Sequence, residues 1–402
     1  MIKFLIALLL YLPTTFLVGS YAYFLFIPIA LICYRKEMIY RARLFLTTPF
    51  KFKYLISFWL VLLLLIGIVL NSFFGNNLMH LFNSGTLVLF PLTILASYVV
   101  ADQGIYRFLL LFIVVEVLVG VLEYIIGVNS LFSSLPKHDF FTNYASLYKT
   151  RVFGLSSNSS FLAQKCLLGF LMVYFVDLRL KSSQLMSLFL LLITGIILTF
   201  GRTVIVVVVV TLILYFSLYL YNFFRQRNYF QITMNKVLFY NSAVFSFLIL
   251  STLPFWTNQF NRMGLPPHQI AESKGTKVLD MAGIGNVEMA GRRELWGEAI
   301  GFIFQNPVSG NHSKRFLVDH IHVHNSFLEY LTTHGIVLFL VMCMFVSCNI
   351  NKTNLFFIGC IAIYSLGQFG IFWDISFLDI VFMSMLLFSV KIINPESYET
   401  GI

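Results

Sequence analysis

Four of the chain's eight histidines fall within sixteen residues, between His320 and Gly335, directly before an apolar run. His320, His322 and His324 alternate, so an extended strand would point all three to one side, as the ligands of a zinc ion require. Carboxylates at ligand spacing are missing nearby, and a solvated histidine-rich loop would explain the cluster without a metal. A third possibility is acid–base chemistry, because an imidazole with the reference pKa of about 6.5 can accept a proton near neutral pH.

His324 is the histidine best placed to act as a base. It stands at the N-terminal edge of an expected membrane helix, where the helix dipole disfavours a protonated ring and keeps the imidazole able to accept a proton. Asn325 follows it, and Glu329 lies further along the same helix. Asn325 is also a residue type that caps helix N-termini, which is its structural alternative. The sequence therefore predicts His324 as a general base, with Asn325 and Glu329 in support.

Arginines occur at three other places that composition does not explain. Arg151 precedes an apolar run, Arg202 stands between two apolar runs with almost no loop, and Arg292 and Arg293 lie upstream of the histidines. Such residues can be interfacial side chains, but a buried arginine is costly enough that it tends to line a cavity or contact a ligand. Guanidinium groups bind phosphate oxygens in pairs and stabilise charge on a departing diphosphate. Arginines above a membrane therefore indicate an anionic, lipid-linked substrate.

The composition is that of an integral membrane protein. Hydrophobic residues make up 59% of the 402 residues and charged residues 11%, with a mean hydropathy of +0.86, whereas soluble domains have about 25% charged residues. Spanning segments must pair their backbone groups internally, and the alternation of barrel strands is absent, so we predict an all-α fold. The formal charge of +10 lies largely in short loops, where it sets topology, so no nucleic-acid partner is expected. The five cysteines lack the spacing of a disulfide framework or a zinc site.

The apolar runs predict about twelve transmembrane helices. They are expected at about 4–18, 20–34, 54–71, 85–101, 107–126, 160–176, 185–200, 203–222, 237–255, 325–348, 354–371 and 376–390. Basic residues crowd the loops at 35–53, 179–181 and 225–236, so these loops and the N-terminus are predicted to be cytoplasmic. The segments 127–159, 201–202 and 256–324 then lie outside.

This topology predicts three regions along the chain. Residues 1–255 hold transmembrane helices one to nine, residues 256–324 form one large, partly helical periplasmic loop, and residues 325–402 hold the last three helices and a short cytoplasmic tail. Within the loop, a helix is expected from about 293 to 304, and Asn306-Pro307 supplies the break that ends it.

Four motifs, in chain order, resemble those of the O-antigen polymerase and ligase superfamily. RVFGLSSNSS is similar to the element before the sixth span, and FGRTV to a turn that more often carries Ser or Thr at the position of Gly201. GRRELWGEAIGFIFQNPVSGN has an Arg, a Trp four residues later and an Asn-Pro-x-x-Gly turn. HVHNSFLEYLTTHG continues with His-Asn-x-x-Leu-Glu, whereas His320 and His322 are not part of the pattern.

Members of this superfamily are multi-pass inner-membrane glycosyltransferases with the GT-C transmembrane fold. The resemblance implies transfer of a glycan from undecaprenyl diphosphate at the periplasmic face, with inversion at the anomeric carbon and without a metal or cofactor. By position, it makes His324 the base that activates the acceptor hydroxyl, and Trp296 a supporting residue. It assigns the donor diphosphate to a set of arginines, namely Arg202, Arg292, Arg293 and Arg151.

The resemblance favours an O-antigen polymerase, in which an undecaprenyl-diphosphate-linked oligosaccharide is both donor and acceptor. EVLVGVLEYIIGVNSLF and TRVFGLSSNSS resemble polymerase sequences, and the loop offers a small acceptor platform. A ligase that transfers the glycan to lipid A core shares the donor chemistry and stays an alternative. A transporter of lipid-linked glycans would also have intramembrane arginines, but it predicts inverted repeats that are not seen here. A polysaccharide chain-length regulator is a partner implied by the resemblance.

Overall fold

The structure is a computed structural model of the chain. It describes residues 2–15, 17–18, 22–47, 52–76, 86–126, 130–131, 151–176, 178, 180–199, 201–225, 279–280, 286–287, 292–318, 322–351, 354–368, 371 and 376–388. Helices make up most of these residues, as the sequence predicts, and the two strands are two residues long. The strands β1 (Leu279–Asp280) and β2 (Asn286–Val287) pair in an antiparallel manner within the predicted large loop.

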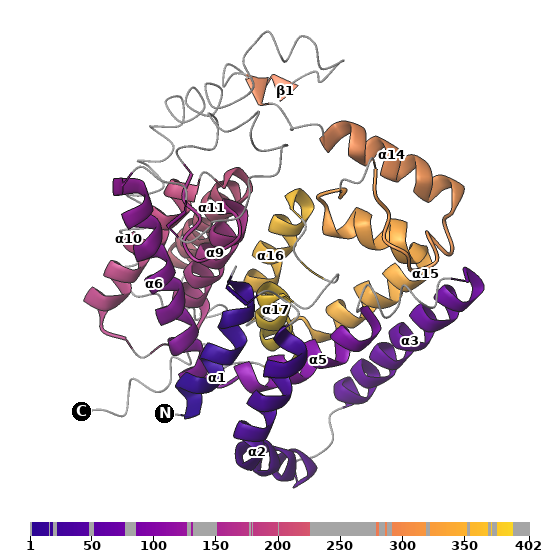
Figure 1. Cartoon of the computed structure of the whole chain (residues 1–402), viewed down its shortest axis with the longest axis horizontal. Coiled ribbons are helices and arrows are strands. Elements are labelled where there is room, and N and C mark those ends of the chain that lie inside the picture. The colour runs from indigo at the N-terminus through magenta and orange to yellow at the C-terminus, as the bar shows by residue number, and fades with distance from the viewer. Residues whose placement is uncertain are drawn as a thin grey trace. The chain divides into compact units, whose positions relative to one another are not determined.

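The chain forms two compact units (Figure 1). The first is built from α1 (Ile2–Tyr11), the short η1 (Leu12–Thr14), α2 (Tyr23–Thr47), α3 (Phe52–Phe74), α5 (Thr86–Val100), most of α14 (Arg292–Gln305), α15 (Ser326–Asn349), α16 (Leu355–Gly367) and α17 (Phe377–Leu387). The second contains α9 (Ser159–Phe175), up to Val173, α10 (Ser182–Thr199) and α11 (Arg202–Arg225). The long helix α6 (Gln103–Ile126) starts in the first unit and continues into the second.

Each predicted span coincides with a helix, apart from 237–255, which lies outside the described residues. Three of the described helices are long and apolar enough to cross a bilayer by themselves: Leu55–Phe74, Gln103–Ile126 and Ser326–Asn349. The other apolar helices are shorter. The protein is therefore a helical, multi-pass membrane protein, while the number of twelve spans, the three-region division and the GT-C architecture stay predictions.

One predicted loop is partly helical. The basic segment 35–53 begins as a continuation of α2, which extends to Thr47. Lysine and arginine are good helix formers, so the helix can continue past the apolar run until a breaker intervenes. Pro49 provides that breaker, because the residue before a proline disfavours helical backbone angles. Hydropathy located the span, but the helix continues beyond it to Thr47, shortly before Pro49 in the sequence.

The first unit packs α15 along α3 and α17 along α5 (Figure 1). A polar cluster ties together helix ends that are predicted to be cytoplasmic. Lys3 Nζ and Tyr34 Oη each lie 2.9 Å from the Asp102 carboxylate, which also accepts the Gly104 N–H at 2.7 Å. Burial alone would raise the pKa of Asp102, but these hydrogen bonds together lower it. The contact agrees with the predicted alternation, which puts all four residues on one side.

The helix α15 is broken at Gly335, which has φ 80° and ψ 173°. The turn that follows α14, residues 306–313, docks into this break. The Ile336 N–H donates to Pro307 O at 2.8 Å, while the N–H groups of the turn donate to the last carbonyls before the break, at 2.7 and 2.8 Å. The donor–acceptor pairs of the turn are Asn311 with Thr332 and Ser313 with Thr333. The predicted outside loop therefore re-enters the helical bundle.

The second unit is organised around the C-terminal half of α6, from Val114 onward. Gly195 on α10 faces Val117 on α6 and Cys166 on α9, and an added Cβ there would lie 2.9 Å from either side chain. Such close contacts between helices at small residues are typical of membrane bundles. The N–H of Phe161 bonds Asn158 Oδ1 at 3.0 Å, which caps the start of α9. The segment 151–158 lies over α6 and α9, because Val152 packs against Gly120 of α6 and Gly154 lies against Glu116 of α6 and Leu162 of α9.

Candidate functional site

His324 has a backbone conformation that few non-glycine residues adopt. Its φ is 54°, in the left-handed region. Such a conformation costs about 1–3 kcal/mol and persists where the surrounding structure fixes it, often at a functional site. The next residue, Asn325, is the N-cap of α15, so the ring is carried on a strained residue just before a helix N-terminus. This is the position that the sequence assigned to the base.

Asn325 fixes that helix N-terminus. Its Oδ1 accepts the N–H groups of Phe327 and Leu328 at 3.0 and 3.1 Å, and its own backbone is extended. Two of the four unpaired donors at the start of α15 are thereby satisfied. The structural role that the sequence allowed for Asn325 is confirmed. The cap also fixes the residue at which the helix starts, and therefore the position of His324 just before it.

Trp296 reaches the residue before His324. Its Nε1–H donates to the carbonyl oxygen of Val323 at 2.9 Å, and the Val323 side chain is completely buried. The helix α14 was predicted at 293–304 and is found at 292–305. This hydrogen bond joins α14 to the backbone next to His324. The sequence placed Trp296 in the site through its spacing, and the structure supplies the contact.

Glu329 is buried in the first turns of α15 and has a basic partner. Arg315 Nε donates to Glu329 Oε1 at 2.7 Å, and His322 Nδ1 lies 3.5 Å from the same oxygen. The Glu329 side chain is 0% exposed, so the guanidinium compensates a carboxylate that water does not reach. Sequence reasoning did not select Arg315. The signal available was an arginine in the loop between two groups already selected, Asn306-Pro307 and the histidines.

The other histidines take separate roles. His320 lies outside the described residues. Because His324 has a left-handed φ, it is not part of an extended strand, and the alternation required for three aligned zinc ligands is not kept there. His334 is buried on α15, where its Nδ1 lies 3.1 Å from Ser313 Oγ and its ring packs on Tyr330. His334 therefore belongs to the contact between α15 and the inserted turn.

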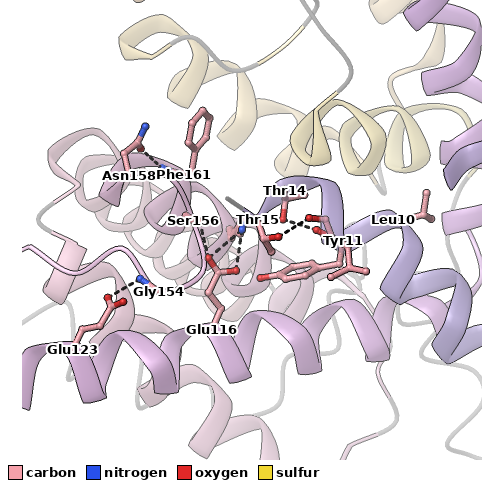
Figure 2. A network of polar contacts seen from close by, with 12 residues as sticks. Leu10, Tyr11, Thr14, Thr15, Glu116, Glu123, Gly154, Ser156, Asn158 and Phe161 are labelled. Carbon is pink, nitrogen blue, oxygen red and sulfur yellow. Dashed lines mark hydrogen bonds and ion pairs between the residues drawn. The ribbon is translucent and has the colours of Figure 1, made fainter. Parts of the chain in front are cut away.

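The segment that carries Arg151 is held by two carboxylates of α6 (Figure 2). Glu123 accepts backbone N–H groups from Leu131 at 3.0 Å, Phe153 at 2.9 Å and Gly154 at 2.8 Å. Glu116, two helical turns earlier, receives the Ser156 hydroxyl at 2.6 Å. Sequence reasoning did not select either carboxylate, although acidic residues in an apolar helix are themselves a signal of function.

Glu116 also forms a buried ion pair with α9. Lys165 Nζ lies 3.1 and 2.9 Å from its two carboxylate oxygens, and the side chains are 3% and 0% exposed respectively. Removing one partner of such a pair would leave an uncompensated buried charge. The pair therefore fixes α6, α9 and the Ser156 hydroxyl as one polar cluster.

Backbone contacts place Arg151 close to the turn that carries Arg202. The Val152 N–H donates to Leu198 O at 3.3 Å, near the end of α10, and Arg202 is the first residue of α11. Gly201 in that turn lies against α9, because an added Cβ would be 2.7 Å from Ala163 Cβ. This contact explains why glycine stands where the family pattern more often has Ser or Thr. Two predicted diphosphate residues thus come from neighbouring segments of the second unit.

The remaining predicted arginines stand at the start of α14. Arg292 and Arg293 are its first two residues. Trp296 follows Arg292 by four positions and Arg293 by three, and both spacings place residues on the same side of a helix. The backbone therefore puts both arginines about one turn before the tryptophan that contacts the segment beside His324.

These features define a multi-pass helical membrane protein with a histidine just before a capped helix N-terminus and arginines at the first residues of α11 and α14. Residues 187–343 match the protein family described as O-antigen ligase. The predicted resemblance to the O-antigen ligase and polymerase superfamily is thereby confirmed. The matched segment includes Arg202, Trp296 and His324, while Arg151 precedes it. A comparison with curated proteins finds no match.

Proposed function

We propose that this protein is an O-antigen polymerase, a glycosyltransferase that extends a surface polysaccharide on undecaprenyl diphosphate at the periplasmic face of the inner membrane. The observation that carries the proposal is His324, held in a left-handed conformation beside a capped helix N-terminus within a segment matching the O-antigen ligase family. A neutral imidazole at that position can take the proton of a hydroxyl group.

The proposed reaction transfers the growing glycan to a lipid-linked repeat unit. His324 takes the proton of an acceptor sugar hydroxyl, whose oxygen attacks the anomeric carbon of the donor sugar. The bond from that carbon to the diphosphate oxygen breaks on the opposite face, so the anomeric configuration inverts. The bonding electrons leave with undecaprenyl diphosphate, and Arg202 and Arg292, aided by Arg151, stabilise its charge. In this scheme no metal or cofactor takes part.

Supporting residues keep the base in place. Trp296 fixes the backbone before His324, and Asn325 fixes the helix after it. The buried Glu329 binds Arg315, so we add Arg315 to the residues that shape this part of the site. Arg293 adjoins Arg292 at the start of α14, and we propose that one of these two arginines contacts the diphosphate. A chain-length regulator is proposed as a partner in the membrane.

The first experiment deletes the gene in its host and compares lipopolysaccharide on gels after complementation with variants. We expect His324→Ala to give cores that carry one repeat unit while the protein level stays normal. His322→Ala is the matched control, because His322 is outside the family pattern, and it should restore the ladder. A full ladder from His324→Ala would refute the proposed base.

The same gels separate the polymerase from a ligase, the activity after which the matched family is described. Bare cores with accumulated lipid-linked polymer would identify a ligase, and an unchanged ladder in the deletion strain would point to another glycan or to transport. Arg202→Lys and Arg292→Lys should shorten the ladder, because lysine keeps the charge but loses the paired donors. Comparing Arg293→Lys with Arg292→Lys shows which of the two adjacent arginines contacts the diphosphate, and wild-type ladders from both would remove the pair from the site.

A further inference from the structure

Two carboxylates of α6 remain without a role in the proposed reaction. Glu116 and Glu123 are seven residues apart, which is about two helical turns, so both lie on the same face of α6. Both contact the segment 152–156, which follows directly on Arg151 (Figure 2). Ionisable residues inside a membrane helix are costly, and apolar packing would join two helices without that cost. Their presence here calls for a function.

Glu123 binds the backbone of this segment. One of its oxygens, Oε2, accepts both the Phe153 N–H at 2.9 Å and the Gly154 N–H at 2.8 Å, while Oε1 accepts the Leu131 N–H at 3.0 Å. Hydrogen bonds from backbone N–H groups to an ionised carboxylate are short and strong. A single side chain thereby fixes the conformation of residues 153–154.

Glu116 brings the segment against the helix itself. Its carboxylate receives the Ser156 hydroxyl and is neutralised by Lys165. Gly154 has φ 59°, and an added Cβ would lie 2.8 Å from Glu116 Cγ and 2.9 Å from Glu116 O, so the backbone passes directly over α6. Ten residues separate Glu116 from Ile126 at the end of α6, which is about 15 Å of helix. The segment therefore re-enters the bundle rather than lying at its edge.

The consequence for Arg151 follows from its neighbours. Val152 is buried against Gly120 of α6, and its N–H is bonded to Leu198 of α10. The backbone after Arg151 is thus held by α6 and α10 at once, with Glu123 fixing the next two residues. The contacts of residues 152–154 therefore position the backbone that carries Arg151.

We propose that Glu123 and Glu116 are positioning residues that present Arg151 to the diphosphate of the lipid-linked donor. The proposal rests on the proposed function, in which Arg151 contacts that diphosphate. Glu123 orders the backbone of the segment, and the Glu116–Lys165 pair holds it at its depth in the bundle. Neither carboxylate contacts the reacting atoms, so their effect passes through donor binding.

The test uses the purified full chain in lipid nanodiscs with an undecaprenyl-diphosphate-linked repeat unit. Glu123→Ala and Arg151→Ala should each raise the KM for the donor by roughly tenfold, with a smaller change in kcat, because binding rather than proton transfer is impaired. If Glu123 acts through Arg151, the double variant should have a KM no higher than that of the worse single variant. Multiplying effects would overturn the proposal.

A conservative variant separates positioning from simple loss of folding. In Glu123→Gln the amide oxygen can still accept the Phe153 and Gly154 N–H groups, whereas the Leu131 bond is lost. We therefore expect Glu123→Gln to recover most of the donor affinity that Glu123→Ala loses. A KM for Glu123→Gln equal to that of Glu123→Ala, or a KM at the wild-type value in Glu123→Ala, would overturn the proposal.

Direct binding distinguishes this inference from the proposed function. Undecaprenyl diphosphate without glycan is titrated into each variant, and Glu123→Ala and Arg151→Ala should both bind it more weakly than wild type. Wild-type binding by Arg151→Ala would refute the role of Arg151 and the positioning role with it. The polymerase proposal is judged separately by His324→Ala, which should bind undecaprenyl diphosphate normally while losing transfer.

Discussion

Substituting Gly335 by alanine should release the turn that is inserted into α15. At φ 80° and ψ 173°, Gly335 occupies a region that is essentially restricted to glycine. An added Cβ would collide with the carbonyl of Val308 and lie 2.9 Å from Gly310 N. Both contacts are with backbone atoms, so no flexible side chain can move to make room. Either α15 straightens or the turn moves away.

The cost can be estimated from the bonds that would break. The backbone conformation costs about 1–3 kcal/mol in a residue other than glycine. Three hydrogen bonds hold the turn in the break, and at about 0.5–1.5 kcal/mol each they add about 1.5–4.5 kcal/mol. A helix that straightens relieves this strain, so the lost bonds set the cost, about 1.5–4.5 kcal/mol, which is a large part of the about 5–15 kcal/mol that stabilises a typical protein.

Thermal unfolding of the purified protein measures this loss. We expect a fall in Tm of at least about 3 °C, taking about 2 °C per kcal/mol for a chain of this size. Hydrogen exchange gives a local readout, because the N–H groups of Asn311 and Ser313 should exchange faster once they leave α15. Gly359→Ala on α16 is the matched control, since nothing lies within 4 Å of a Cβ there.

The reasoning would be refuted if Gly335→Ala unfolded at the same temperature as Gly359→Ala. It would also be refuted if the Tm fell while residues 311 and 313 kept their slow exchange, because the inserted turn would then still be in place.

Two further substitutions test the support of the base. Trp296→Phe keeps the ring but loses the hydrogen bond to Val323, so we expect kcat for glycan transfer to fall several-fold with little change in Tm, and an unchanged kcat would remove Trp296 from the site. Asn325→Ala should destabilise the protein by about 1 kcal/mol through loss of the helix cap, whereas Asn325→Asp keeps an acceptor and should stay near wild type in a parallel melting experiment.

Local patterns in the sequence predicted much of this structure. Hydropathy located helices at the described spans, since the requirement to pair backbone groups in lipid acts on each apolar run separately. Residue chemistry predicted α14 to within a residue at each end and the capping role of Asn325, because a capping side chain bonds N–H groups two or three positions away. The resemblance to the family motifs was also readable from the sequence, and it implied a supporting role for Trp296.

Contacts between distant segments were decided by the tertiary structure. The partner of Glu329 is Arg315, fourteen positions away, and the backbone groups bound by Glu123 come from as far as position 154. No spacing rule predicts such pairs, because the intervening loop can close in many ways at nearly the same entropic cost.

The same distinction between local sequence and tertiary structure applies to His324, the proposed base. The sequence determined that a membrane protein resembling this family carries a histidine before an apolar helix, at position 324. The left-handed backbone of that histidine, the break of α15 at Gly335 and the re-entry of both outside segments were decided by packing. The physical reason is that helix propensity and hydropathy act within a few residues, whereas strained conformations and buried charges persist where distant parts of the chain enclose them.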